Sequence, residues 1–425
     1  MNAAQLARTD SNDFNEATSM QGIPRAAAQR ATRTAIRLAA LAASGLTVIC
    51  AHAAPEAAPD VAAIRAAVDA AVRPMMAKND IPGMAVGVTV GGKSYVFNYG
   101  VASKQSGKPV DDRTLFEVGS VSKTFNATFG AKALVEGKLK LSDHPSRHLP
   151  ALKGHPIDHA TLLNLVTYTA GGLTLQVPDA VTDEASLMRY LQQWKPEFAP
   201  GEKRRYSNPS IGLFGRAAAA AMGRDYADAV ESDLLPQLGL REAYLRVPAS
   251  AMADYATGYD KDDRQAGAPD VAVRVTPGAF DAESYGIKTT AADLVRFMQV
   301  NIDPGALEAT TRQAVEATHI GHFQVDGMTQ GLGWEQYPWP VPLAQLQAGN
   351  TLGNATSKVV PLDRTPAGPR LFNKTGSTRG FGAYVVFVPT QRIGVVLLGN
   401  RRWPIPERVD AAYAILGRLQ AANAR

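Results

Sequence analysis

The chain has 425 residues, of which 45% are hydrophobic and 20% are charged, so it is long enough to bury a large core and too apolar to be a disordered chain. Its net charge of +5 is small for this length, and the Lys and Arg residues are scattered along the sequence. This distribution argues against a basic binding surface, so no nucleic-acid partner is expected.

The first fifty residues differ in kind from the rest of the chain. Four arginines between positions 25 and 37 precede an apolar stretch at 38–49, and an A-x-A pattern ends at Ala53. A basic region, a short apolar core and such a pattern are typical of a secretory signal. We therefore expect residues 1–53 to be a leader segment that is cleaved near Ala53 on export to the periplasm.

The leader also bears on the start of the chain and on its cysteine chemistry. Residues 1–19 are polar and unusual ahead of a signal, so translation could start at Met1 or at Met20. The single cysteine, Cys50, lies inside the leader, so neither disulfides nor cysteine catalysis are expected in the mature protein. No later segment reaches the roughly 20 apolar residues of a membrane span. We expect residues 54–425 to form one catalytic domain that acts as a monomer.

Helices and strands are predicted in blocks along the chain. Residues 60–78 have apolar side chains at helical spacing, with Asp60 as an N-cap. Two β-type runs at 85–90 and 95–99 lie on either side of Gly91-Gly92, which predicts a hairpin. From about 140 to 300 the strand signals fade, and helices are predicted at 158–168, 184–194, 211–222, 226–238 and 290–300.

Strand signals return near the C-terminus. β-type runs are predicted at 371–374, 382–388 and 393–398, before a closing helix at 407–422. Strands at both ends indicate a two-lobed α+β fold, in which the two chain ends form one antiparallel sheet flanked by helices. The sheet lobe would comprise about 60–120 and 330–425, and a mostly helical lobe, about 140–300, would be inserted between them. Residues 258–285 carry no regular pattern, and so long a loop is usually functional.

A candidate nucleophile lies at the start of a predicted helix. Ser120 follows Gly119 and precedes a run of helical spacing that ends at Gly137. Ser120 and Lys123 would share a face of this helix, and a lysine shielded from water can take the serine proton because desolvation lowers its pKa. About one S-x-x-K is expected by chance in a chain this long, so the pattern by itself identifies nothing.

Two further strings contain polar residues that suit acyl transfer. Tyr206 and Asn208 lie just before a predicted helix: a phenol held near cations can shuttle a proton, and a carboxamide can bind an amide substrate or Lys123. Lys374 lies on a predicted edge strand with a glycine-rich exit, and the backbone N–H of Ser377 could join that of Ser120 in an oxyanion hole. The alternatives are a packing tyrosine, a capping asparagine and an exposed lysine at a turn.

The order and spacing of S-x-x-K, Y-S-N and K-T-G resemble those of the class C serine β-lactamases. The resemblance extends to longer strings and covers about residues 60–422. These strings lie at 165–173, 176–178, 277–278, 285–286, 331–335 and 404–409. The chain departs from the commonest family pattern at Asn373, Arg402 and Ile405.

The resemblance implies a role for each matching residue. Ser120 would be the acylated nucleophile and Lys123 its partner, while Tyr206 would assist proton transfer and Lys374 would hold the charge state of Tyr206. The backbone N–H groups of Ser120 and Ser377 would form the oxyanion hole. The residues implied to bind substrate are Gln176 and Asn208 at its side-chain amide, Tyr285 beside it, and Thr375, Gly376 and Arg408 near its carboxylate.

The predicted function is hydrolysis of the β-lactam amide of cephalosporins and penicillins through an acyl-enzyme, and hence antibiotic resistance. A D-alanyl-D-alanine carboxypeptidase or a carboxylesterase on the same scaffold remains an alternative, as does a non-hydrolytic β-lactam sensor. No cofactor or metal is expected, because the sequence contains no H-E-x-x-H, Walker or G-x-G-x-x-G pattern.

Overall fold

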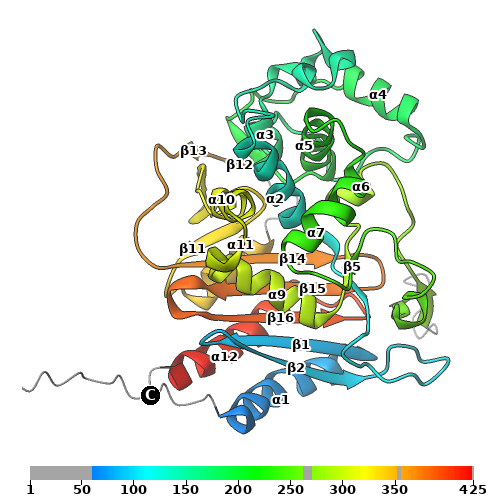
Figure 1. Ribbon diagram of the computed structural model, residues 1–425, viewed down its shortest axis with the longest axis vertical. Coiled ribbons are helices and arrows are strands. Elements are labelled where there is room, and N and C mark those ends of the chain that lie inside the picture. Colours follow the sequence, from blue (N-terminus) through cyan, green and yellow to red (C-terminus); the bar gives the residue numbers. More distant parts are fainter. Residues whose placement is uncertain (1–59, 262–269, 352–355, 424–425) are drawn as a thin grey trace, which may run out of the picture. The chain divides into compact units, whose positions relative to one another are not determined.

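A nine-stranded antiparallel sheet forms the centre of the computed structural model, which describes residues 60–261, 270–351 and 356–423 (Figure 1). Its strand order is β13-β9-β10-β11-β14-β15-β16-β1-β2. The strands are β1 Gly83–Val90, β2 Lys93–Gly100, β9 Phe323–Val325, β10 Met328–Gln330, β11 Glu335–Pro338, β13 Val360–Pro361, β14 Arg370–Ser377, β15 Gly382–Val388 and β16 Ile393–Gly399. The predicted leader lies outside the described residues.

The two ends of the chain meet inside this sheet. β1 pairs with β16 in antiparallel register, with Val86 opposite Leu397. β1 and β2 form the predicted hairpin around Gly91 and Gly92, both of which have a positive φ that suits glycine. The predicted α+β fold, with an antiparallel sheet made from both chain ends, is confirmed.

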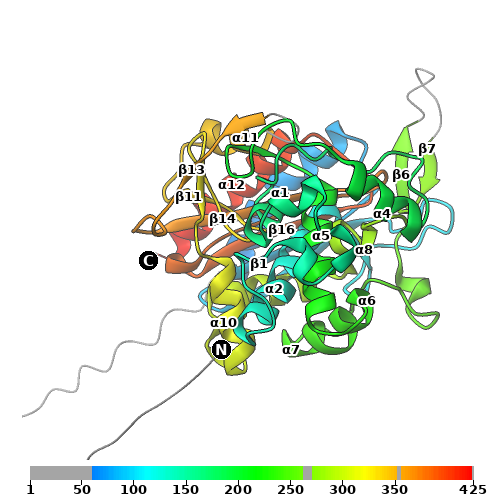
Figure 2. The same ribbon diagram turned by 90° about the horizontal axis from the view of Figure 1, so that it is seen from above.

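Helices cover both faces of the sheet (Figures 1 and 2). The helices α1 Val61–Lys78 and α12 Ile405–Asn423 pack together, in a cluster that includes Val86 and Leu397. The helix α9 Ala291–Ile302 belongs to the other cluster, with the neighbouring strand residue Ala85. Because successive side chains of a strand point to opposite faces, this alternation places α9 opposite α1 and α12.

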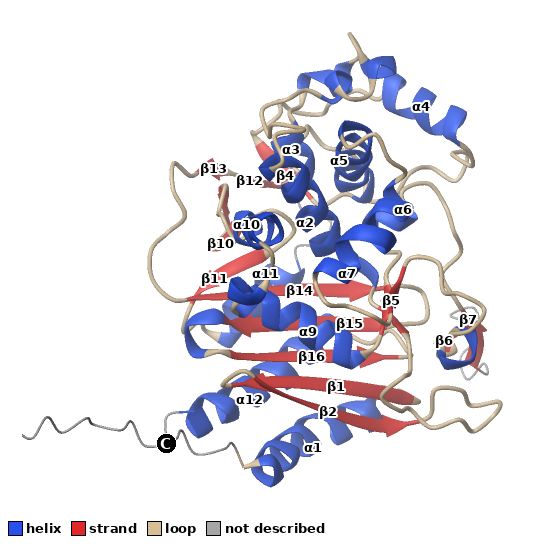
Figure 3. Ribbon diagram, in the orientation of Figure 1, coloured by secondary structure: helices blue, strands red, loops and turns tan. Residues whose placement is uncertain are grey.

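Two of the helices predicted in the helical region, over 158–168 and 226–238, are shorter or interrupted in the structure, whereas those predicted over 184–194, 211–222 and 290–300 form nearly as expected (Figure 3). The helix expected over 158–168 shrinks to α3, because Thr161 caps it by accepting from the backbone N–H of Asn164. A π turn interrupts the helix expected over 226–238, just before Pro236, which has no N–H to donate. The helices here are α2 Ser122–Val135, α3 Leu162–Val166, α4 Glu184–Gln193, α5 Asn208–Ala221, α6 Tyr226–Ala229, α7 Leu235–Gln237 and α10 Ala309–Thr318.

The long segment 258–285 contains regular structure that its sequence does not indicate. Strand β6 Gly258–Lys261 pairs with β7 Asp270–Val273, and a short helix, α8 Asp281–Ser284, follows. An ion pair of 2.8 Å between Arg379 and Asp260 ties this hairpin to the turn after β14, a long-range contact that no local pattern encodes. The remaining elements are β3 Phe116–Glu117, β4 Lys203–Arg205, β5 Ala243–Tyr244, β8 Lys288–Thr289, β12 Thr356–Lys358 and α11 Leu343–Thr351.

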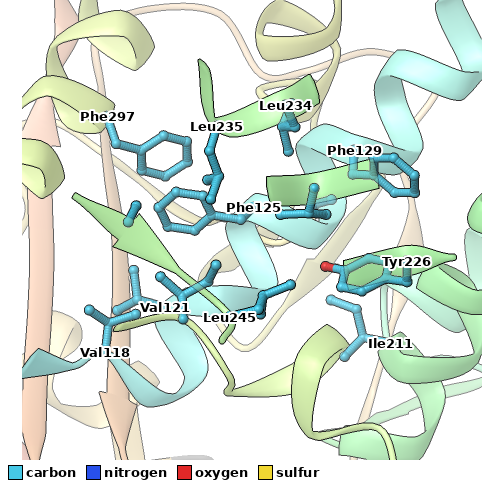
Figure 4. Close-up of a cluster of buried hydrophobic side chains, with 14 of the residues drawn as sticks. Val118, Val121, Phe125, Phe129, Ile211, Tyr226, Leu234, Leu235, Leu245 and Phe297 are labelled. Carbon is cyan, nitrogen blue, oxygen red and sulfur yellow. The ribbon is translucent and has the colours of Figure 1, made fainter. Parts of the chain in front are cut away.

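Aromatic packing anchors α2 to the sheet through α9. The Phe125 ring stacks on that of Phe297 with 3.9 Å between centroids, and Phe297 in turn lies 6.1 Å from Trp334. Val121, Phe125 and Phe129 are all buried, as their helical spacing predicts, and Figure 4 shows them among side chains from neighbouring helices. The position of the α2 N-terminus therefore depends on this core.

We expect Phe125→Ala to lower the free energy of unfolding by about 3–5 kcal/mol, because it removes a fully buried ring and leaves a cavity. Urea unfolding followed by circular dichroism measures the change. The exposed Val61, where 46% of the residue surface is accessible, provides the control, and Val61→Ala should leave the midpoint unchanged. A loss below about 1 kcal/mol for Phe125→Ala would show that this core does not anchor α2.

Candidate active site

The candidate nucleophile lies on a tight turn that is pressed against a strand. Ser120 occupies a single 3-10 turn, Gly119–Val121, which leads directly into α2. Gly119 has φ +51°, and a Cβ there would come within 2.4 Å of the backbone N of Ser377 on β14. A Cβ on Gly376 would lie 1.9 Å from the carbonyl O of Val118. Two glycines thus let this turn and β14 approach closely enough to bring the N–H groups of Ser120 and Ser377 together.

Lys123 is hydrogen-bonded to the serine hydroxyl. Its ammonium Nζ lies 3.0 Å from Ser120 Oγ and donates to the carbonyl O of Ser284 at 2.7 Å. The residue is completely buried, and this burial, helped by the charge of Lys374, lowers the pKa of Lys123 to about 8 even though Tyr206 opposes the shift. A lysine with this pKa can accept a proton near neutral pH.

Tyr206 lies between two lysines. Its ring centroid is 5.2 Å from Lys123 Nζ and 5.0 Å from Lys374 Nζ. Burial raises the pKa of the Tyr206 phenol, but the two ammonium groups outweigh burial, and the pKa ends below its ordinary value. The neighbouring Tyr168 is also buried, yet its pKa is raised well above the ordinary value because burial dominates there. Tyr206 is therefore the tyrosine suited to carry a proton.

A buried carboxylate, which ends the 331–335 string but has no role assigned from the sequence, holds Lys374 and a second cation. Glu335 Oε1 lies 3.6 Å from Lys374 Nζ and 3.1 Å from Arg204 Nη2. Arg204 Nε also donates to Gln330 Oε1 at 2.8 Å. Neither Glu335 nor Arg204 lies in one of the three short motifs. Their role beside Lys374 is therefore visible only from their pairing in the folded chain.

Ser120, Tyr206, Arg204, Glu335 and Lys374 open onto one cavity of about 260 Å³, whereas Lys123 is buried beneath its lining. The cavity is lined by Ser120, Leu175, Arg204, Tyr206, Glu335, Gly349, Asn350, Lys374, Thr375, Gly376, Ser377 and Ile405. A larger cavity of about 610 Å³ lies among residues 231–248, but it contains none of the predicted site residues. The smaller cavity is the candidate active site because of the reactive groups that line it, although it is not the larger of the two.

The predicted edge strand is an edge over half of its length only. β14 pairs with β15 along most of its length, but with β11 only from Arg370 to Asn373. Lys374 to Ser377 therefore extend beyond β11 and leave one side of the strand available to the cavity. The predicted pairing of a ligand backbone with this strand is therefore possible along its K-T-G-S half, and not along the half that pairs with β11.

Four of the predicted substrate-binding residues do not line the cavity. Gln176 is exposed, and its neighbour Leu175 contacts the cavity instead. Asn208 is buried, and its Oδ1 has no hydrogen-bond partner within the described residues, while Ser207 and not Asn208 caps α5. Tyr285 is half-buried, directly after α8. The fourth residue, Arg408, is buried and does not line the cavity.

Arg408 is fully buried and bonded to the protein. Its Nη1 donates to the carbonyl O of Gly376 at 2.6 Å and to Ser377 Oγ at 3.0 Å, and its Nε donates to the carbonyl O of Trp403 at 3.0 Å. The guanidinium thus supports the strand that carries Lys374 without lining the cavity itself. These contacts suit a residue that positions the cavity wall better than one that binds the substrate carboxylate.

Comparison with known proteins agrees with this geometry. Residues 68–420 match the family model Beta-lactamase. A β-lactamase of Pseudomonas fluorescens is 52% identical over 352 residues, which are 82% of this chain and 96% of that protein. A crystal structure of a class C β-lactamase superposes with a TM-score of 0.80 at 46% identity and covers 84% of this chain and 98% of that one. The chain belongs to the class C β-lactamases. It is a hydrolase of β-lactams, and the predicted family and enzyme class are confirmed.

Other relatives of this class C enzyme carry a second activity in their names. The crystal structure of a D-alanine carboxypeptidase from Burkholderia cenocepacia is 46% identical, with a TM-score of 0.78, and covers 84% of this chain and 99% of that one. A β-lactamase/D-alanine carboxypeptidase from Pseudomonas syringae is 42% identical, with a TM-score of 0.80, and covers 84% of this chain and 99% of that one. Overall similarity therefore does not separate the two activities.

The three departures from the family pattern have different surroundings. Asn373 is buried beside Lys374, where its Nδ2 donates to the carbonyl O of Glu335 at 3.1 Å and its Oδ1 accepts from Tyr384 at 3.2 Å. Ile405 lines the cavity, whereas Arg402 is exposed and does not. In residues 60–261, 270–351 and 356–423, no three His, Cys, Asp or Glu side chains gather as a metal site requires.

Lys374→Met should raise the pKa of Tyr206, because one of the two cations that oppose its desolvation is removed. A spectrophotometric titration of tyrosinate, measured as the difference between each protein and its Tyr206→Phe counterpart, isolates this phenol from the other tyrosines. The exposed Lys195 offers a matched control, and Lys195→Met should leave the difference curve in place. An unchanged pKa in Lys374→Met would mean that Lys123 alone controls Tyr206.

Arg408→Met should lower the free energy of unfolding by about 3 kcal/mol, because the buried acceptors on Gly376, Ser377 and Trp403 lose their donor. Urea unfolding measures this loss, and Arg418→Met, at an exposed arginine of α12, is the control. Full stability combined with a raised KM for anionic β-lactams would instead indicate direct contact with the substrate carboxylate.

Proposed function

We propose that this class C enzyme hydrolyses the β-lactam amide of cephalosporins and penicillins through an acyl-enzyme on Ser120. The observation that carries the proposal is the 3.0 Å contact between Ser120 Oγ and the buried Lys123, whose pKa is lowered to about 8. A serine hydroxyl becomes a strong nucleophile only when an adjacent base takes its proton. Tyr206 and Lys374 stand beside this pair and supply a second proton carrier with its counter-charge.

In acylation, Ser120 Oγ attacks the lactam carbonyl carbon while its proton passes, through Lys123 in its neutral form, to the Tyr206 phenolate. The carbonyl oxygen becomes an oxyanion, which the N–H groups of Ser120 and Ser377 would stabilise as hydrogen-bond donors. The C–N bond then breaks, and Tyr206 returns the proton to the leaving nitrogen. A phenol whose pKa lies below its ordinary value suits both directions of this transfer.

In deacylation, water must lose a proton to attack the ester on Ser120. Tyr206, as a phenolate between Lys123 and Lys374, would accept that proton and then pass it to Ser120 Oγ as the acyl group leaves. Glu335 limits the positive charge here, since it pairs with Lys374 and Arg204. This network would set the ionisation of Tyr206.

We propose which side chains and backbone groups of the site contact the substrate. Thr375 and Gly376 line the cavity beside Lys374, which offers the positive charge that a substrate carboxylate needs. Asn208 lies outside the cavity lining, but its buried Oδ1 has no hydrogen-bond partner within the described ranges, and we propose that it accepts from the substrate side-chain amide. Gln176 and Tyr285 would flank the substrate side chain at the entrance, and Arg408 would act by holding Gly376 and Ser377 in place.

The same site suits a D-alanyl-D-alanine carboxypeptidase, whose substrate also presents an amide and a carboxylate. The observation that favours this second candidate is the similarity to structures described as D-alanine carboxypeptidases. The two activities differ in the fate of the acyl-enzyme with β-lactams, because a lactamase must admit and activate water. The position of Tyr206 between two cations supports deacylation and hence the lactamase.

We also propose that the chain is exported to the periplasm after cleavage near Ala53 and acts there as a monomer against antibiotics. The basic and apolar composition of residues 1–53 supports export. None of the helices in the described ranges has the length and apolarity that crossing a bilayer requires.

The purified protein should turn over a chromogenic cephalosporin, and Ser120→Ala should lower kcat by about 10⁴-fold or more, because the covalent step is removed. Mass spectrometry of the quenched reaction should show the acyl adduct on Ser120 and no adduct on the variant. Lack of turnover in the wild type, or turnover that survives the substitution, would refute the proposal. Rapid acylation without release would favour the carboxypeptidase.

A further inference from the structure

The short helix α8 carries the carbonyl group that holds Lys123. Lys123 Nζ donates to the carbonyl O of Ser284, the last residue of α8, at 2.7 Å, and this contact is fully buried. A helix of four residues has too few internal hydrogen bonds to be stable by itself. The position of Ser284 must therefore be set by what α8 packs against.

The helix α5 supplies the first of these contacts, with two residues one turn apart on one face. Gly212 has no side chain, and a Cβ there would come within 2.4 Å of the Phe280 ring, so the ring packs directly on the helix. Arg216 follows four residues later, with its Cζ 5.5 Å from the same ring centroid. Arg216 Nε lies 3.3 Å from Glu283 Oε1. A ring contact and an ion pair thus dock α8 on α5.

Backbone contacts continue from this ion pair to the catalytic lysine. The carbonyl O of Glu283 accepts from Asn126 Nδ2 of α2 at 3.0 Å. The hydroxyl of the next residue, Ser284, donates to the carbonyl O of Asn208 at 3.0 Å, and the carbonyl O of Ser284 accepts from Lys123 Nζ. Arg216 also pairs with the exposed Glu184 on α4. A continuous set of contacts therefore leads from the surface of the helical region to Lys123.

We propose that Arg216 and Glu283 are positioning residues for acyl transfer: they fix α8 on α5 and thereby hold the Ser284 carbonyl against the Lys123 ammonium. The inference rests on the proposed roles of Ser120 and Lys123. Neither Arg216 nor Glu283 lines the active-site cavity. Their loss should therefore lower kcat and change its pH dependence while leaving KM nearly unaltered.

The ion pair with Arg216 offsets only part of the cost of burying the Glu283 charge. Four ionisable side chains face the Glu283 carboxylate. They are Arg216 on α5, Asp281 on α8 itself, Tyr226 on α6, and Tyr285, which directly follows α8. Burial, together with Asp281, raises the pKa of Glu283 from 4.5 to about 7, although Arg216 opposes the shift. Because the folded pKa exceeds the unfolded one, ionisation of Glu283 costs stability as the pH rises through about 7. A charge retained at that cost favours a positional role.

The test compares Glu283→Gln, Arg216→Gln and Arg216→Lys in the purified full chain. Glu283→Gln keeps the shape of the side chain and removes its charge, so it should unfold at a temperature no lower than the wild type at pH 8. Its kcat for a chromogenic cephalosporin at pH 8 should nevertheless fall about tenfold, with KM within about twofold. The difference in kcat should shrink at pH 6, where Glu283 of the wild type is mostly neutral.

The arginine variants separate charge from geometry. Arg216→Gln should match Glu283→Gln in kcat at pH 8, and Arg216→Lys should recover part of the loss because it keeps a cation near Glu283. Arg189, an exposed arginine on α4, provides the matched control, and Arg189→Gln should keep the kcat and pH profile of the wild type.

Wild-type kcat and an unchanged pH profile in Glu283→Gln and Arg216→Gln would overturn the proposal. Failure of Glu283→Gln to fold would also overturn it, since the pair would then be a stability element; if only Arg216→Gln fails to fold, Glu283→Gln decides. These outcomes differ from failure of the proposed function. Absence of turnover in the wild type refutes the role of Ser120, whereas wild-type turnover with unaffected variants refutes only the positioning role.

Discussion

The burial of the Lys123 ammonium is the constraint on which the rest of the site depends. A cation removed from water is costly unless other groups replace its hydration. Here the Ser284 carbonyl and the Ser120 hydroxyl accept hydrogen bonds from it, and the Tyr206 ring lies alongside. These contacts do not replace all of the lost hydration, so the pKa of Lys123 is lowered to about 8, which makes the lysine a usable base. Both the α2 core and the docking of α8 serve to keep this group dry and in place.

Close backbone approach is the second requirement, and it explains why the turn before α2 and the half of β14 beyond β11 contain glycine. Any side chain at Gly119 or Gly376 would meet backbone atoms of the other segment. The two N–H groups that could face an oxyanion therefore come from segments that are far apart in the chain. Arg408 holds the β14 segment in place by donating hydrogen bonds to the carbonyl O of Gly376 and to Ser377 Oγ.

Charge balance around Tyr206 sets its chemistry. Two ammonium groups favour its phenolate, while Glu335 restrains their effect by pairing with Lys374 and Arg204. Tyr168, with its ring centroid only 4.8 Å from that of Tyr206, lies outside this balance and has a raised pKa. Two adjacent tyrosines thus differ in acidity because of which cations face them.

The sequence by itself determined the elements with strong local signals. The hairpin around Gly91 and Gly92, the helix after Ser120 and the pairing of the two chain ends all follow from apolar periodicity and turn residues, which act over a few positions. The S-x-x-K, Y-S-N and K-T-G strings likewise predicted the reacting groups, because those residue types suit acyl transfer and their order and spacing resemble those of the family. The predicted helix over 226–238 was wrong in detail, since Pro236 breaks its hydrogen-bond pattern.

Only the tertiary structure decided what surrounds those groups. The pairing of Glu335 with Arg204, the burial of Arg408 and the docking of α8 by Arg216 join segments separated by many residues, and no local pattern encodes such contacts. The same holds for the pKa of Lys123, which depends on desolvation and on charges brought in by other strands and helices. Sequence periodicity reports short-range geometry, whereas the dielectric and the charges around a side chain are properties of the packed fold.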